Sequence, residues 1–425
     1  MKTSAKTHHH KIELLNSQFT SRKNKKTNIV AQSELLAPAG DLACLTAAIK
    51  AGADAVYLGL KELNMRATGK NFTITQLKQA SKICKKNKVK IYLTLNTIIY
   101  DSEIKKLEST IKKVRPYVNA IICWDLSVIQ LCKKYKIPFH ISTQASVSNT
   151  ESAKFYKKLG AKRIILAREL NLKQIKQISK TIPVETFIHG AMCVSVSGRC
   201  FTSQFLQNQS ANRGRCTHPC RRAYQITDLT EPKNKLILQN NRVMSAKDLC
   251  TLPLIEKLKK AGITSFKIEG RNRSPEYVYT VTSIYRKALD KKLTKPEINK
   301  ALEQLKEVYN RGFSTGFYLK SPTADDFSTT EHGEQKQKKK FIGKIIKYWP
   351  KVKVAHIKIS NDGLKTASPV YIIGKTTFLK TSVESIETNH KPVTQANKSQ
   401  DVGIKFTDDK TLKKGDEVYL IEEKK

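Results

Sequence analysis

Short apolar runs alternate with longer amphipathic stretches from residue 34 onward. Continuous β-branched runs are typical of strands buried on both faces of a parallel sheet, and amphipathic stretches between them are typical of covering helices. Eight such strand–helix units predict an α/β fold of the (β/α)8, TIM-like barrel type over residues 34–320. The runs are Leu35–Ala37, Ala55–Leu60, Lys90–Asn96, Ala120–Trp124, Phe139–Ser142, Arg163–Ala167, Val184–Ile188 and Ser265–Ile268.

Polar side chains follow these runs where the predicted strands end. In a barrel of this type the carboxyl ends of the strands meet at one mouth, where active sites lie. We therefore expect a shared site there, although a part of these side chains can serve only to cap helices or close loops. The side chains expected to bind substrate or transfer protons there are Gln144, Arg168, Glu169, His189, Glu269 and Arg271.

The spacing between the seventh and eighth runs breaks the rhythm. Roughly 75 residues separate them, where about 30 suffice for a strand–helix–strand unit. The excess, about residues 190–245, is predicted to project from the mouth of the barrel. Long insertions at this place usually carry function.

The segments outside the barrel differ in character. Residues 1–33 are rich in Lys, Ser, Thr and Asn and are predicted to form a flexible basic arm. Residues 321–340 are polar and end in a lysine run, so we expect a linker. Residues 341–425 hold five or six short strand-like runs without helices, which predicts a small closed β-barrel with a binding or docking role.

Five of the nine cysteines fall in the insertion or shortly after it: Cys193, Cys200, Cys216, Cys220 and Cys250. Structural zinc prefers two pairs of cysteines with two to four residues inside each pair, and only Cys216 and Cys220 approach that spacing. An iron–sulfur cluster accepts four thiolates from irregularly spaced loop positions, so the spacing favours a 4Fe–4S cluster, while zinc and a thiol nucleophile remain alternatives. The other four cysteines lie in apolar contexts and are predicted to pack in the core.

The formal net charge is +42, from 78 Lys and Arg residues against 36 Asp and Glu residues. Such an excess favours a polyanionic partner such as RNA, whereas lysines spread over solvated faces are the alternative interpretation. No acidic residue occurs from Thr186 to Thr227, a stretch that contains Arg199, Arg213, Arg215, Arg221 and Arg222. These arginines can offset a thiolate-bound cluster or clamp phosphates. Stacking faces for bases are offered nearby by Phe201, Phe205 and Tyr224.

The chain contains no run that approaches the ~18 consecutive apolar residues of a membrane helix. Its basic N-terminal region lacks the apolar segment of a secretory signal. Cysteines without such a signal favour a reducing compartment, where thiols bind metals or act in redox chemistry. We therefore expect a cytoplasmic protein.

Several longer motifs resemble a known family. Glu185–Cys193, Ser197–Cys200 and Asn212–Cys216 resemble, in that order, the signature of the collagenase-like peptidase family 32 of unknown catalytic type. The resemblance spans about residues 34–425 and is closest to the branch that hydroxylates transfer-RNA uridine. Further matches to the family pattern are Leu35–Asp41, Ser142–Gln144, Ser245–Cys250, Lys267–Arg271 and Arg311–Gly316.

This resemblance implies an oxygen-independent hydroxylase that carries a 4Fe–4S cluster. It implies formation of 5-hydroxyuridine at the wobble position of transfer RNA, with prephenate as the oxygen donor. Other branches act on a ribosomal RNA cytidine or on ubiquinone precursors. The expected cluster ligands are Cys193, Cys200, Cys216 and Cys250, with Cys220 as the alternative for one of them.

The remaining roles are assigned by chemical type. Proton transfer is assigned to Glu169, His189 and Glu269. Substrate binding is assigned to Gln144, Arg168, Arg213, Arg221 and Arg271, because guanidinium groups bind carboxylates and phosphates in pairs of hydrogen bonds. Two other functions stay open. One is a peptidase in which Cys193 or Cys200 acts with His189, and the other is a non-catalytic RNA-binding protein with structural zinc.

Overall fold

The computed structural model describes residues 33–222, 226–236, 244–330, 333–408 and 412–424. Residues 33–425 form one compact unit. The predicted basic arm, residues 1–33, lies outside the described residues except for Ser33. Of the helices described, none is both long and apolar enough to cross a membrane.

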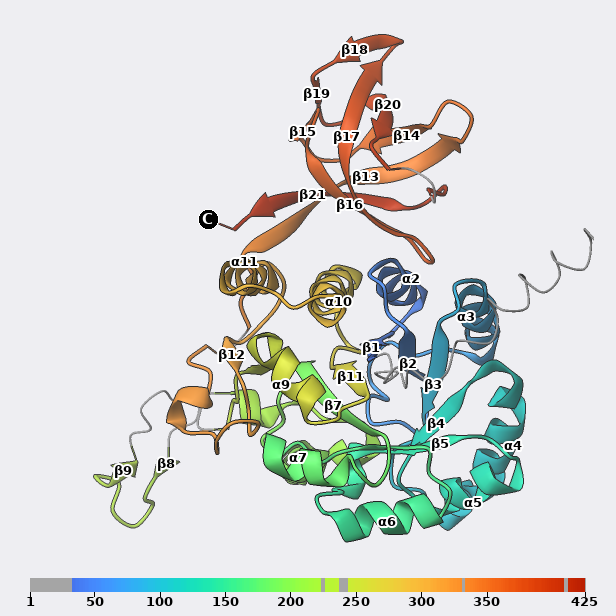
Figure 1. Ribbon diagram of the computed structural model, residues 1–425. Helices are drawn as coiled ribbons and strands as arrows, with labels where there is room; N and C mark the ends of the chain where they lie inside the picture. The colour runs from blue at the N-terminus through green and yellow to red at the C-terminus, as the bar shows by residue number, and fades with distance from the viewer. Residues whose placement is uncertain (1–32, 223–225, 237–243, 331–332, 409–411, 425) are drawn as a thin grey trace, which may run out of the picture. The chain divides into compact units, whose positions relative to one another are not determined.

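Eight parallel strands close into a barrel, as the pattern of apolar runs predicts (Figure 1). Each strand pairs with the next along the chain, and the last one pairs with both the seventh and the first. The fold prediction is confirmed. The strands are β1 (Glu34–Pro38), β2 (Ala55–Gly59), β3 (Lys90–Thr94), β4 (Ala120–Cys123), β5 (Phe139–Ile141), β6 (Arg163–Ile165), β7 (Val184–Gly190) and β11 (Ser265–Ile268).

Helices surround this barrel in Figure 1 and bury their apolar faces against it. Polar residues begin several of them: the Asp41 side chain accepts a hydrogen bond from Cys44 N at 2.8 Å, and Thr73 and Gln76 form a capping box. Such caps satisfy backbone N–H groups that the first helical turn leaves free. The helices are α2 (Leu42–Lys50), α3 (Ile74–Lys86), α4 (Ile104–Val114), α5 (Leu126–Lys134), α6 (Thr150–Lys158), α7 (Leu172–Ile178), α9 (Ile255–Lys260), α10 (Pro275–Asp290) and α11 (Lys295–Lys306).

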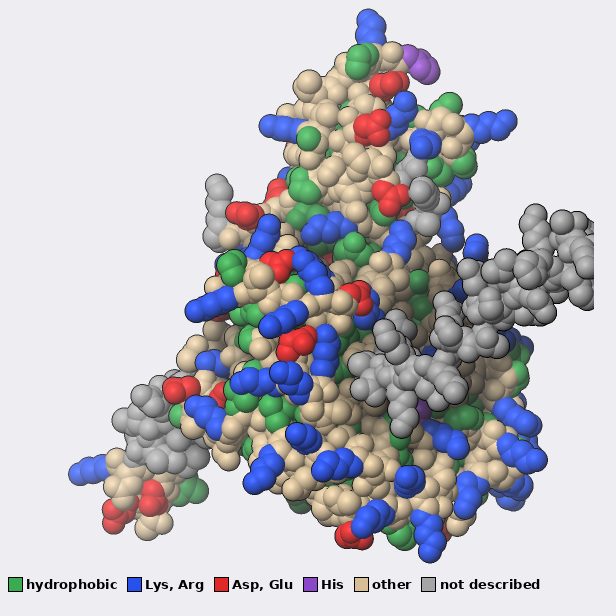
Figure 2. All heavy atoms as spheres, in the orientation of Figure 1, with side chains coloured by type: hydrophobic (Ala, Val, Ile, Leu, Met, Phe, Trp, Pro, Cys, Tyr) green, Lys and Arg blue, Asp and Glu red, His purple; other side chains and the backbone are tan. Residues whose placement is uncertain are grey.

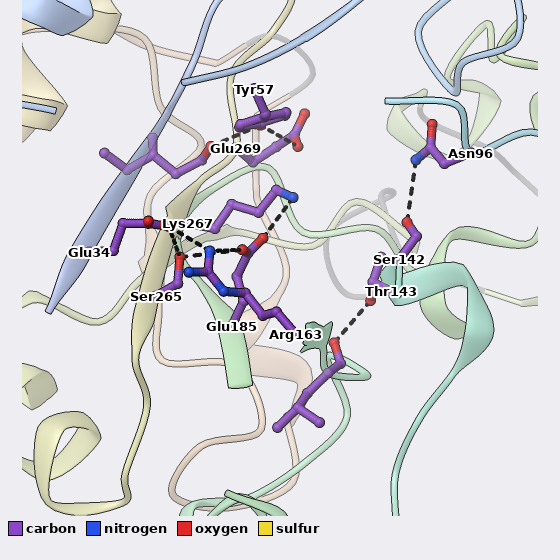
Figure 3. A network of polar contacts seen from close by, with 12 residues as sticks. Glu34, Tyr57, Asn96, Ser142, Thr143, Arg163, Glu185, Ser265, Lys267 and Glu269 are labelled. Atoms are coloured by element: carbon purple, nitrogen blue, oxygen red, sulfur yellow. Dashed lines mark hydrogen bonds and ion pairs between the residues drawn. The ribbon is translucent and has the colours of Figure 1, made fainter. Parts of the chain in front are cut away.

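Ion pairs occupy part of the barrel interior, where apolar layers are the usual filling. Figure 3 shows Glu185 between Arg163 and Lys267: Arg163 Nη1 lies 3.2 Å from Glu185 Oε2, and Lys267 Nζ lies 2.9 Å from Glu185 Oε1. Arg163 also contacts Glu34. Burial alone would raise the pKa of Glu34, but Arg163 holds that pKa at about 2. Every charge in this group has a partner, and removing one partner of a buried pair costs about 3–5 kcal/mol.

The insertion leaves the barrel at the end of β7 and returns to the same place. Gly190 has a φ of +103°, and a Cβ there would lie 2.5 Å from the Glu269 carbonyl oxygen, so this turn requires glycine. The strand β10 (Asp248–Cys250) then pairs antiparallel with the end of β7 and parallel with β12 (Phe313–Ser314). Other elements of the insertion are α8 (Thr202–Gln207), β8 (Ile226–Thr227) and β9 (Lys235–Leu236).

A second, antiparallel barrel follows at the C-terminal end of the chain, as predicted. Six strands close it in the order β16-β21-β13-β14-β20-β17, with β17 paired back to β16. The predicted linker, residues 321–340, needs correction, because β13 begins at Gln337 and takes up the lysine run, while Phe327 bridges to Ala246 of the insertion. The strands are β13 (Gln337–Trp349), β14 (Val354–Ile359), β16 (Pro369–Ile373), β17 (Phe378–Thr388), β20 (Asp401–Phe406) and β21 (Glu417–Glu423).

Positive charge is spread widely over the surface. On the face in Figure 2, Lys and Arg side chains are scattered over the helices and the small barrel, with acidic side chains among them. On this face the charge alone therefore does not mark a binding site. The described contacts between side chains are more informative.

Candidate active site

A cavity of about 130 Å³ lies between the carboxyl ends of the barrel strands and the insertion. Among the described residues, four cationic side chains and one carboxylate line it: Arg66, Arg168, Lys267, Arg271 and Glu269. This excess of positive charge suits an anionic ligand or an anionic cluster. Its position is the one that active sites occupy in barrels of this type.

Four thiols line this cavity: Cys193, Cys200, Cys216 and Cys220. All are free, and each comes from the insertion. Burial raises the pKa of the Cys220 thiol, with nearby Cys193, Cys216 and Cys200 adding to the rise and Arg221 opposing it. The insertion therefore gathers four cysteines that are spread over 28 residues of sequence.

Three of the four thiols have described hydrogen bonds, most of them with nearby hydroxyl groups. Cys193 Sγ lies 2.9 Å from Ser195 Oγ, and Cys200 Sγ lies 3.2 Å from Thr202 Oγ1. As the described side chains stand, no group of three His, Cys, Asp or Glu residues is placed to hold a metal ion. The donor set nevertheless fits a 4Fe–4S cluster in number and chemistry, because such a cluster takes four thiolates.

Cys250 lies elsewhere. It belongs to β10, is only 3% exposed, and accepts a hydrogen bond from Tyr285 Oη at 3.7 Å. Burial raises its pKa to about 11. It does not line the cavity, so the structure joins Cys220 and not Cys250 to the other three thiols.

Arg168 offers unused hydrogen-bond donors in the cavity wall. Its Nη1 donates to the Ala191 carbonyl at 3.0 Å, and its guanidinium lies 4.8 Å from the centre of the Phe187 ring. Its Nε and Nη2 atoms are buried without a hydrogen-bond partner. Leaving such donors unpaired is costly, and a carboxylate or phosphate of a ligand would satisfy both.

Glu269 is surrounded by cations. Arg66 Nη2 lies 3.1 Å from its Oε1, and Tyr57 Oη donates to its Oε2 at 3.3 Å. Burial alone would raise the pKa of Glu269, but Arg66, Arg168 and Arg271 hold it below its usual value. The group is therefore ionised at neutral pH, which suits it to fixing the arginines and accepting hydrogen bonds from a ligand.

Arg271 and Gln144 complete the polar wall. Arg271 Nη1 donates to Thr94 Oγ1 at 2.6 Å, and burial lowers the pKa of Arg271 to about 10. The Gln144 amide oxygen accepts a hydrogen bond from Asn96 at 3.3 Å and one from Ser142. Figure 3 shows Asn96, Ser142 and Thr143 side by side at these strand ends.

Two of the predicted proton carriers do not line the cavity. Glu169 accepts hydrogen bonds from Ser197 N at 2.8 Å and Ser197 Oγ at 3.1 Å, so it anchors the insertion. His189 is 1% exposed and packs against the rings of Tyr277, Tyr285 and Phe313. Burial lowers the pKa of His189 to about 3, so it stays neutral in the core.

Three arginines of the insertion are engaged in internal contacts. Arg213 forms a pair with Glu103 and also contacts the Ile98 carbonyl. Arg221 donates to the Ala246 carbonyl at 2.6 Å, and Arg199 donates to the Gln144 carbonyl at 3.0 Å. Arg213 and Arg221, which were predicted to bind substrate, are instead engaged within the chain: Arg213 joins the insertion to Glu103 after β3, and Arg221 joins parts of the insertion region to one another.

Some cavity residues were not singled out from the sequence as site residues. Arg66 lies in the loop after β2, and no pattern in that loop marks it. Tyr57 and Lys267 lie within strands, and Lys267 Nζ is 4.4 Å from the centre of the Tyr57 ring. The alternation of side chains along a strand could have identified Lys267. Ser265, Lys267 and Glu269 are two residues apart, so Lys267 lies on the same face of β11 and its extension as the predicted site residue Glu269.

Fold and site together define a class: a TIM-like barrel whose mouth is covered by a cysteine-bearing insertion around a cationic cavity. The model of peptidase family U32 matches residues 40–328, and the chain belongs to this family.

Similar proteins carry different names. An uncharacterized protease of Methanocaldococcus jannaschii is 41% identical over 92% of this chain and 98% of its own length. A collagenase of Porphyromonas gingivalis is 39% identical over 87% of this chain and 94% of its own length. A tRNA hydroxylation protein of Bacillus subtilis is 36% identical over 79% of this chain and 82% of its own length.

Proposed function

We propose that this protein hydroxylates an RNA base by an oxygen-independent reaction, most specifically the wobble uridine of transfer RNA. The observation that carries the proposal is the convergence of four thiols on one cavity whose wall includes Arg168, a side chain with two buried donors that have no described partner. The similarity to a protein named for tRNA hydroxylation supports it. The barrel and its cavity supply the pocket that an extruded base needs.

The cluster ligands in this proposal are Cys193, Cys200, Cys216 and Cys220, which all line the cavity. A 4Fe–4S cluster supplies one-electron redox chemistry when it is bound. The arginines around the cavity offset the negative charge that thiolate ligation brings. Cys250, which the sequence favoured over Cys220, has a structural role in this account.

The oxygen donor in this proposal is prephenate, whose carboxylates suit a cationic wall. Arg168 binds one carboxylate through its Nε and Nη2 atoms, which form the fork that bidentate recognition needs. Arg271 and Arg66 supply further positive charge, and Glu269 fixes the orientation of Arg66.

The direct test is a reaction with purified components. Anaerobically prepared protein is incubated with unmodified transfer RNA and prephenate, and the nucleosides are analysed by mass spectrometry. The proposal predicts a uridine that has gained one oxygen atom, and no gain without prephenate. A ribosomal RNA fragment in a parallel reaction tests the related cytidine target. No new nucleoside from either RNA would contradict the proposal.

A peptidase is the second candidate, because a relative is named collagenase. The hydrolase pattern Gly-x-Ser-x-Gly does occur, at Gly312–Gly316. It does not form the strand–turn–helix elbow of such enzymes, since Ser314 lies in the short β12 and donates to Asp326. His189 is buried outside the cavity that Cys193 and Cys200 line. Gelatin cleavage by the purified protein is the assay that would favour this candidate.

A further inference from the structure

Exposed apolar side chains gather in one part of the insertion. Single exposed apolar residues are common on protein surfaces, but contiguous groups mark interaction sites. Five of the fourteen large apolar side chains that are exposed in the described chain fall within residues 194–206. They are Val194, Val196, Phe201, Phe205 and Leu206.

Two phenylalanines dominate this group. Phe201 is 64% exposed and Phe205 is 84% exposed, and their ring centres lie 6.2 Å apart. Phe201 directly precedes α8, and Phe205 follows it by one helical turn, so both rings lie on one side of that helix. Each ring keeps an open face that a planar group can cover.

Arg215 and Arg222 of the insertion are both exposed, and their contacts differ from those of Arg199, Arg213 and Arg221. Arg215 and Arg222 are exposed, and no hydrogen bond or ion pair is described for either side chain. Arg199, Arg213 and Arg221 are instead engaged with carbonyl or carboxylate groups. The guanidinium groups of Arg215 and Arg222 are therefore available to a partner.

Three of these four side chains lie within two residues of a cavity cysteine in the sequence, and Phe205 contacts the ring of Phe201. Phe201 follows Cys200, Arg215 precedes Cys216, and Arg222 comes two residues after Cys220. Each of these cysteines lines the cavity. We call Phe201, Phe205, Arg215 and Arg222 the rim. A chain that inserts one base into the cavity has its neighbouring nucleotides beside the rim.

We propose that the rim binds the unpaired nucleotides on either side of the target base, with bases stacked on Phe201 and Phe205 and phosphates paired with Arg215 and Arg222. Aromatic faces with adjacent cations are the chemistry that single-stranded nucleic acid uses, and the absence of acidic residues from Thr186 to Thr227 keeps the potential positive. The inference rests on the proposed function and names the side chains that hold the unpaired nucleotides around its target base. Paired bases present no free faces to the rings.

The test measures binding to the full chain by fluorescence anisotropy. The probes are a labelled oligouridylate of about eight nucleotides, within the usual site size, and a fully paired RNA of equal length. Phe205→Ala is expected to weaken oligouridylate binding about tenfold, since a stacked base contributes about 1–3 kcal/mol. Phe155→Ala removes a ring that is 59% exposed on α6 and serves as the matched control, with no change expected.

The arginines are tested through salt dependence. Each phosphate contact with a single strand contributes about 0.7 to the slope of log K against log salt. Arg215→Ala with Arg222→Ala should therefore lower that slope by about 1.4, whereas Arg115→Ala, an exposed arginine before β4, should leave it unchanged. Equal affinity for the duplex, unchanged binding in the rim variants, or no RNA binding at all overturns the rim proposal.

The outcome is separable from that of the proposed function. If the wild type hydroxylates transfer RNA but the rim variants keep its Kd and KM, the rim proposal is wrong and the proposed hydroxylase function stands. If the rim variants weaken oligouridylate binding but no hydroxylated nucleoside forms, the proposed hydroxylase function is wrong and the rim remains an RNA-binding surface.

Discussion

Among single side chains, Arg168 has the most direct consequence for ligand binding. Its Nη1 donates a hydrogen bond to the Ala191 carbonyl, and its buried Nε and Nη2 atoms have no hydrogen-bond partner. Glu269 shows the opposite arrangement, because its charge is already balanced by Arg66. The cavity thus combines one satisfied carboxylate with one unsatisfied guanidinium.

Arg168→Met should raise the KM for an anionic donor by about 10–100-fold, since hydrogen bonds to charged groups contribute about 1.5–3 kcal/mol. The melting temperature is measured beside the KM, because the variant removes two unpaired buried donors but also the hydrogen bond to the Ala191 carbonyl. Arg168→Lys keeps the charge but loses the fork, so we expect an intermediate KM. Steady-state kinetics with varied donor concentration measure this. An unchanged KM in Arg168→Met would show that Arg168 does not bind the donor.

The buried ion pairs of the barrel interior make stability depend on pH. The folded pKa of Glu34 is about 2, below its ordinary value of 4.5. Its contribution is therefore fully present above pH ~5 and is lost as pH falls toward 2. By the 1.36 kcal/mol per unit of pKa, this contribution is about 3 kcal/mol. Urea denaturation between pH 3 and 7 should show a weaker pH dependence in Glu34→Gln, but not in the exposed control Glu151→Gln.

The residue roles were only partly predictable from the sequence. Strand ends placed Gln144, Arg168, Glu269 and Arg271 around one cavity, because all parallel strands of a barrel end at the same mouth. The same reasoning did not distinguish His189 from the residues that line the cavity. His189 is the second-last residue of β7, and its side chain is buried in the core. Sequence shows where a strand ends but not which side chain faces the ligand.

At the scale of elements, the insertion is held by side chains rather than by regular structure. Glu169 binds Ser197, Arg199 binds the Gln144 carbonyl, and Arg213 binds Glu103. These contacts join three separate barrel loops to one long segment. A segment with few regular elements otherwise bears a large entropy cost of ordering.

Arg213→Ala should loosen the insertion without affecting the contacts with phosphate. We expect limited proteolysis within residues 190–222 to become several-fold faster, while the slope of log K against log salt for RNA stays at the wild-type value. Glu103→Gln should act in the same direction, since it removes the partner charge. A reduced salt slope in Arg213→Ala would instead restore this arginine to the RNA-binding surface.

Elements were more predictable than contacts. All eight barrel strands were found because buried parallel strands read as continuous apolar runs, and the six strands of the small barrel were found by their short, helix-free spacing. The linker ended earlier than expected because the lysines of residues 338–340 lie in a strand. A charged run on the solvent-exposed part of a strand has the composition of a loop.

At the scale of the whole molecule, the site depends on two parts of the fold. The barrel provides Arg168, Glu269 and Arg271, and the insertion provides the four thiols. The small barrel shares apolar packing with the large one, since Phe378 lies 5.3 Å from Tyr279 between ring centres. The large positive charge is distributed over the surface shown in Figure 2, so in the proposed function it attracts RNA in general, and the cavity is the proposed place of reaction.

The ligand set predicts the metal content of cysteine variants. Anaerobically prepared wild type should contain about four irons and four sulfides per chain. Cys220→Ala should lose this cluster, whereas Cys250→Ala should retain it with a lower melting temperature, because Cys250 is buried beside Tyr285. Iron and acid-labile sulfide analysis of the two variants shows which cysteine the cluster requires. A cluster retained in Cys220→Ala but lost in Cys250→Ala would reverse the assignment.

The central claim is that this chain hydroxylates RNA through the thiol-lined cavity. Nucleoside mass spectrometry of bulk transfer RNA, from a strain that lacks this protein and any related enzyme, tests it most directly. The account predicts that 5-hydroxyuridine derivatives disappear on deletion and return with the wild-type chain or Cys250→Ala, but not with Cys220→Ala or Arg168→Met. Undiminished 5-hydroxyuridine derivatives in the deletion strain would contradict it.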